Sequence, residues 1–130
     1  MLLLRYGRSL EDYEKAIRLD PEVNGVSRLA DQLATAFATR GDAATALDRR
    51  WAAIKEYDYA IRANPEYALA YRNRGAAYRQ LRLLGAAGKD FDTAVLLDPR
   101  DTKARAYQDI IHTELIKRQR ATQGVHQPFP

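Results

Sequence analysis

Two histidines and two serines are the side chains of this sequence best suited to catalysis or metal binding. A histidine can hold a metal ion or carry a proton, and a serine can act as a nucleophile beside a base. Neither His112 nor His126 belongs to a metal-binding motif, and neither Ser9 nor Ser27 lies in a nucleophile elbow. No glycine pattern resembles a phosphate-binding loop. We therefore expect no enzyme, no metal site and no cofactor.

Composition limits the protein further. The chain has 130 residues, a net charge of +4 and no cysteine, so it forms one domain without disulfides or thiolate metal sites. The first four residues are too short a run, soon interrupted by Arg5, to be a secretory signal. No apolar run approaches the length of a membrane span. We expect a cytoplasmic protein whose charge moderately favours acidic partners.

The sequence repeats itself with a step of 34 residues. Residues 34–67 laid over residues 68–101 give identity at 12 of 34 positions. Apolar residues recur three and four apart, which is helical spacing. Each unit is predicted to form two helices, over 34–48 and 51–63 and again over 68–82 and 85–97. Pro65 and Pro99 end the second helix of each unit.

Small residues lie where the two helices of a unit must cross. Gly41 and Gly75 fall inside the first helices, where glycine costs roughly 1 kcal/mol relative to alanine. A neighbouring helix that passes too closely for a side chain would explain both glycines. The bulky aromatic residues Tyr57 and Phe91, on the second helices, would fill the remaining space.

This pattern resembles the tetratricopeptide repeat (TPR) family. The residues that carry the resemblance are Phe37, Arg40-Gly41, Ala44, Ala53, Tyr57 and Pro65 in one unit, and Tyr71, Arg74-Gly75, Tyr78, Ala87, Phe91 and Pro99 in the next. Arg40 and Arg74 replace the usual leucine. The resemblance implies an all-α, right-handed solenoid of antiparallel helix pairs with about six helices. Such arrays usually present a binding surface and seldom carry out chemistry.

The flanks complete one domain over residues 1–121. Residues 1–21 match the second helix of a unit and form a half repeat, and residues 22–33 add an insertion and a helix extension that starts near Val26. Residues 102–121 form a C-terminal cap helix, and residues 122–130 form a disordered tail. Because the half repeat lacks its own first helix, its candidates for exposed apolar side chains are Leu2, Leu3, Leu4, Tyr6 and Leu10. A longer protein, a second copy that forms a homo-oligomer, or the long helix itself would cover them.

The resemblance also implies where a partner binds. In this family the first helices of successive units line a concave groove. Carried over, the groove residues are Leu69, Arg72, Asn73, Ala76, Arg79, Gln80, Lys103 and Ile110, together with Thr35, Ala38, Thr39, Asp42, Thr45, Ala106 and Tyr107. We expect an adaptor or scaffold that binds a protein or an extended, acidic peptide there.

Two alternatives follow from the same surface. Some family members grip the terminal carboxylate of chaperone tails, and Asn73 and Lys103 match two positions of that grip. Ala38, Asp42 and Tyr107 stand where lysine, asparagine and arginine are usual. The other alternative is RNA or another polyanion, although RNA-binding repeats carry a denser basic stripe interleaved with aromatics.

Overall fold

The structure is a computed structural model that describes residues 10–12, 14–15, 18 and 26–126. Its helices are α2 (Val26–Ala46), α3 (Arg50–Ala63), α4 (Ala68–Gln80), α5 (Leu84–Leu97) and α6 (Thr102–His126). The described residues 10–12, 14–15 and 18 are also helical, and the described part contains no strand. The expected helix boundaries in 26–97 are met to within two residues.

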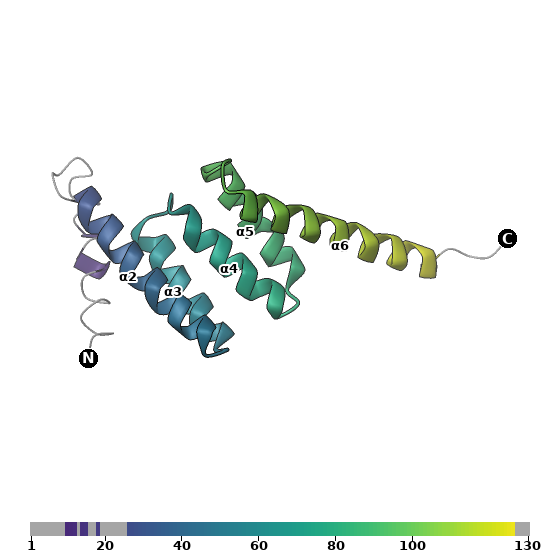
Figure 1. Ribbon diagram of the computed structural model, residues 1–130, viewed down its shortest axis with the longest axis horizontal. Helices are drawn as coiled ribbons and strands as arrows, with labels where there is room; N and C mark the ends of the chain where they lie inside the picture. Colours follow the sequence, from purple (N-terminus) through teal and green to yellow (C-terminus); the bar gives the residue numbers. More distant parts are fainter. Residues whose placement is uncertain (1–9, 13, 16–17, 19–25, 127–130) are drawn as a thin grey trace.

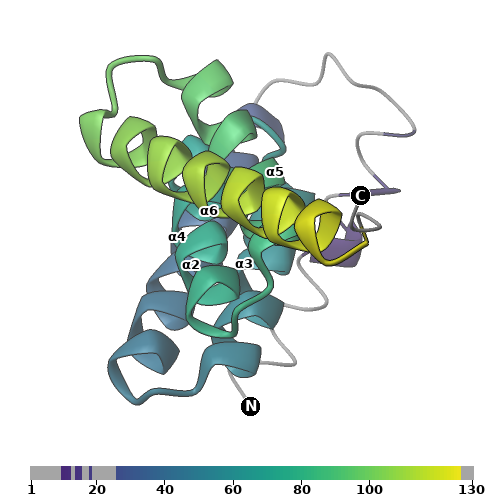
Figure 2. The ribbon, with the colours of Figure 1, turned by 90° about the vertical axis from the view of Figure 1, so that its right-hand side faces the viewer.

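The helices stack as antiparallel pairs in chain order (Figure 1). α2 packs against α3 and α4 against α5, and α3 and α5 each contact the first helix of the following unit. α6 crosses the end of the stack, and its C-terminal half extends away from the other helices (Figures 1 and 2). In the described residues, each helix is too short or too polar to cross a membrane.

The turns between helices also obey the 34-residue step. Asp48 and Arg82 both adopt a left-handed backbone, with φ of 57° and 63°. Each lies in a turn that ends a helix. The backbone N–H of Arg49 donates to the carbonyl of Ala44 at 2.9 Å, and one step later Leu83 donates to Tyr78 at 2.9 Å. The side chains of Asn64 and Asp98, the residues before the two prolines, each accept a hydrogen bond from the backbone N–H of the residue after the proline. The two prolines therefore occupy equivalent turns, as the repeat predicts.

The helix crossings explain the two glycines. A Cβ atom on Gly41 would lie 2.5 Å from the ring of Tyr57, and one on Gly75 would lie 3.0 Å from the ring of Phe91. These separations are shorter than ordinary van der Waals contact. The alanines at the same crossings, Ala60 and Ala94, are fully buried. The predicted close approach of the two helices within each unit is confirmed.

Ion pairs inside each unit account for the two arginines that replace leucine. Arg40 contacts Glu56 at 3.3 Å, and Arg74, one step later, contacts the buried Asp90 at 2.7 Å. Arg74 also contacts Asp58 of α3 at 2.7 Å, so it joins α3, α4 and α5. Its hydrogen bond to Asp90 raises the pKa of Arg74. An arginine at this position is therefore part of the packing between helices.

The half repeat packs against the helices that follow it. Leu10 is only 2% exposed and belongs to the same buried cluster as Leu33 and Phe37 of α2. Glu14 pairs with Arg62 of α3 at 2.9 Å. Of the coverings that the sequence left open, the long helix is the one that buries Leu10, since α2 supplies Ala30, Leu33 and Phe37 to its cluster. Leu2, Leu3, Leu4 and Tyr6 lie outside the described residues.

The expected disordered tail is partly wrong. α6 continues to His126, so residues 122–126 are helical. The hydroxyl of Thr122 donates to the carbonyl of Arg118 at 3.0 Å, and no proline follows until Pro128. The helix therefore meets no residue that removes a backbone donor before that point. Residues 127–130 lie outside the described part.

Candidate functional site: a hollow across three first helices

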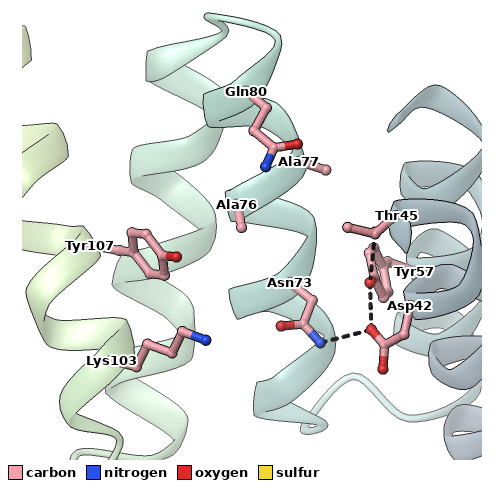
Figure 3. A pocket seen from close by; sticks show the side chains of 9 residues that line it. All are labelled: Asp42, Thr45, Tyr57, Asn73, Ala76, Ala77, Gln80, Lys103 and Tyr107. Carbon is pink, nitrogen blue, oxygen red and sulfur yellow. Dashed lines mark hydrogen bonds between the residues drawn. The ribbon is translucent and has the colours of Figure 1, made fainter. Parts of the chain in front are cut away.

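A hollow of about 260 Å³ opens over α2, α4 and α6. The residues that line it are Asp42, Thr45, Tyr57, Asn73, Ala76, Ala77, Gln80, Lys103 and Tyr107 (Figure 3). α2 contributes Asp42 and Thr45, α6 contributes Lys103 and Tyr107, and Tyr57 reaches the hollow from α3. A hollow of this size holds a few side chains of a peptide.

The repeat explains why these residues meet. Asp42 and Ala76 are one step apart, and so are Asn73 and Tyr107. Equivalent positions on successive first helices face the same side of the stack, because each unit repeats the orientation of the last. The small side chain of Ala76 lies between the polar residues and leaves the space open (Figure 3).

A hydrogen-bond network joins lining residues of α2, α3 and α4 (Figure 3). The Tyr57 hydroxyl donates to Oδ1 of Asp42 at 2.6 Å, and Asn73 Nδ2 donates to the same oxygen at 3.2 Å (Figure 3). The Thr45 and Tyr57 hydroxyls lie 3.4 Å apart. Burial, and secondarily the bond to Asp42, raises the pKa of Tyr57, so its hydroxyl stays protonated as a donor. The network holds the Asp42 carboxylate at a defined place.

Four of the eight sequence-predicted site residues line the hollow, namely Asn73, Ala76, Gln80 and Lys103. Gln80 is also tied to α3, because it accepts from Arg50 at 2.8 Å. Leu69 and Ile110 are exposed outside the hollow.

The two arginines expected in the groove have partners inside the protein. Arg72 is bound to Asp101 at 2.8 Å, with both side chains mostly buried. The guanidinium of Arg79 lies over the ring of Tyr107, 5.5 Å from its centre. Of the three cations expected to bind an acidic partner, only Lys103 lines the hollow.

Some groove assignments carried over from the family also change. Asp42, Thr45 and Tyr107 do line the hollow, but Ala38 is buried in the core and cannot contact a ligand. Its position on α2 faces the cluster that contains Leu10. Sequence reasoning placed Tyr57 only in the core. The signal that could have located Tyr57 was Gly41. Because Gly41 has no side chain, the ring of Tyr57 on α3 can lie against α2 and extend to the hollow on its far side.

His112 lies on α6 outside the hollow. Its Nε2 atom is 2.8 Å from Oδ1 of Asp92, which also accepts from Gln108 at 2.9 Å. These contacts join α5 to α6. Within the described ranges, no three His, Cys, Asp or Glu residues are grouped as metal ligands would be.

Stacked helix pairs with a polar hollow on the first helices define an α-helical repeat module. The sequence matches no protein-family model and no curated protein. Solved structures do match. The second TPR domain of Spaghetti (RPAP3), bound to the HSP90 peptide SRMEEVD, is 32% identical with a TM-score of 0.63, over 69% of this chain and 83% of that domain. The chain belongs to the tetratricopeptide repeat family.

Two further structures share the fold. The first TPR domain of Spaghetti (RPAP3), also bound to the HSP90 peptide SRMEEVD, is 24% identical with a TM-score of 0.62, over 88% of this chain and 82% of that domain. The first TPR domain of the human RPAP3 protein is 27% identical with a TM-score of 0.59, over 88% of this chain and 83% of that domain. The all-α repeat fold expected from the sequence is confirmed.

Proposed function

We propose that this protein is an adaptor that binds a peptide segment of a partner protein along the groove over α2, α4 and α6. The observation that supports this most directly is the polar hollow, whose lining offers both hydrogen-bond donors and acceptors at the surface of three successive first helices. Two solved domains with the same fold hold a peptide. Backbone amides of an extended peptide need such donors and acceptors.

The remaining groove residues would extend the contact beyond the hollow. Leu69 on α4 and Ile110 on α6 are exposed apolar residues, and they would pack against side chains that flank the bound segment. Arg79 and Tyr107 form a cation–aromatic pair that would add to the contact. Arg72 would act indirectly, since its bond to Asp101 holds the start of α6.

RNA binding is not favoured by the described side chains. Nucleic-acid repeats stack bases on open aromatic rings. Tyr57 is buried, and the ring of Tyr107 stacks on Phe91 at 5.0 Å and is covered by Arg79. No open ring is therefore left in the hollow for a base.

The test is partner capture from a cell extract with the double variant Asn73→Ala/Lys103→Ala. The variant removes a donor and the cation from the hollow but leaves the core intact, because neither side chain is buried. We expect the captured proteins to be lost while the helical circular dichroism is unchanged.

The matched control is Lys55→Ala/Lys89→Ala. These two exposed lysines lie one step apart on the second helices α3 and α5, away from the hollow. This control should retain the partners. If the hollow variant captures the same proteins as the wild type, the proposed groove is refuted.

A further inference from the structure

The hollow contains one negative and one positive side chain. Asp42 lies on α2 and Lys103 lies on α6, with Asn73 of α4 between them (Figure 3). The other lining residues are neutral at pH 7. The formal charge of the hollow is therefore zero, and its two ends have opposite sign.

The Asp42 carboxylate accepts hydrogen bonds only from neutral groups among the described residues. Its Oδ1 atom accepts both the hydroxyl of Tyr57 and the amide of Asn73. Across the described residues, no arginine or lysine pairs with this carboxylate, and its second oxygen has no hydrogen bond. The carboxylate is therefore fixed in place, negatively charged and able to accept a further donor.

The same network argues against a terminal carboxylate as ligand. Asn73 turns its amide toward Asp42 (Figure 3), so one of its donors is already used. Arg72 is neutralised by Asp101, which leaves Lys103 as the cation of the hollow. A carboxylate placed beside Asn73 would meet the like charge of Asp42, and like charges repel.

We infer that the hollow binds a lysine or arginine side chain from an internal stretch of the partner's peptide, with its cation against Asp42. This inference rests on the proposed function. An ammonium or guanidinium group supplies the charged donor that the second oxygen of Asp42 lacks. Lys103, at the other end of the hollow, repels a second basic side chain and attracts an acidic one. The preferred segment therefore carries one basic and one acidic residue.

Selection from a random peptide library displayed on phage tests this inference, with wild-type protein, Asp42→Asn and Asp109→Asn as baits. Asp42→Asn keeps the shape of the side chain and an oxygen that accepts from Tyr57, but removes the charge. Asp109 is an exposed acid of α6 outside the hollow, so its variant is the matched control. We expect wild type and Asp109→Asn to enrich peptides with lysine or arginine, and Asp42→Asn to lose that enrichment.

The best wild-type peptide is then synthesised and titrated into each protein. Its dissociation constant should rise about tenfold or more in Asp42→Asn, as expected for the loss of a hydrogen bond to a charged group. The constant should be unchanged in Asp109→Asn. Enriched peptides that depend on a free carboxylate end, or basic enrichment that persists in Asp42→Asn, would overturn the inference and leave peptide binding intact. A selection that enriches no peptide would overturn both the inference and the proposed function.

Discussion

The contact between Gly41 and Tyr57 gives the sharpest test of the packing. In Gly41→Ala the new methyl group would lie 2.5 Å and 2.8 Å from atoms of the Tyr57 ring. The ring cannot easily retreat, because Tyr57 is 1% exposed and its hydroxyl is bound to Asp42 at 2.6 Å. Either the ring or α2 must shift to admit the methyl group.

Two effects of opposite sign decide the magnitude. Alanine is favoured over glycine inside a helix by about 1 kcal/mol. Overpacking of a well-filled core typically costs about 1–3 kcal/mol. The separation of 2.5 Å is far inside van der Waals contact, so overpacking wins, and we expect a net loss of about 1 kcal/mol or more in the free energy of unfolding.

Thermal unfolding followed by circular dichroism measures this loss, with Gly85→Ala as the matched control. Gly85 lies in the first turn of α5, and nothing would lie within 4 Å of its Cβ. The control should raise the melting temperature slightly, whereas Gly41→Ala should lower it by roughly 4 °C. A Gly41→Ala protein that melts as high as the Gly85→Ala protein would refute the close crossing of α2 and α3.

Two other changes test the core and the start of α6. Ala94 is only 1% exposed, so Ala94→Leu overpacks the core and should lower the free energy of unfolding by about 1–3 kcal/mol. Leu96 is 80% exposed, so Leu96→Ala should change the melting temperature little. Burial raises the pKa of Asp101, but the Ala104 N–H and Arg72 outweigh it and lower that pKa overall. Its stabilisation is therefore present at neutral pH and is lost as pH falls through the lowered pKa. The melting-temperature gap between wild type and Asp101→Ala should shrink from pH 7 to about pH 3, and a constant gap would contradict this assignment.

The repeat allowed most of the fold to be read from the sequence, since both glycines, both prolines and the helix boundaries follow the same step. The flanks were harder to predict. The sequence left open what covers the half repeat, and only the packed helices show that α2 buries Leu10. α6 continues past residue 121 because no proline interrupts it before Pro128. The end of this helix has no equivalent in the repeat, so a comparison of one unit with the next could not locate it.

For the candidate site, the resemblance identified the groove but not which of its side chains are available. Arg72 and Lys103 are both basic residues at groove positions, yet Arg72 is bound to Asp101 and Lys103 lines the hollow. In the sequence, Asp42 is only a groove position at which the grip on chaperone tails usually has asparagine. In the structure it is the acceptor at the centre of a network with Tyr57 and Asn73.

The sequence alone determined the helix pairs, their order and the positions where they cross, because these depend on spacing and side-chain size. The tertiary structure decided which charges remain available to a partner. That outcome depends on distances of a few ångströms between side chains on different helices. Asp42 meets Asn73 across 31 positions of the chain, and Arg72 meets Asp101 across 29. Charge at a repeat position can therefore be read from the sequence, whereas its neutralisation can be read only from the packed helices.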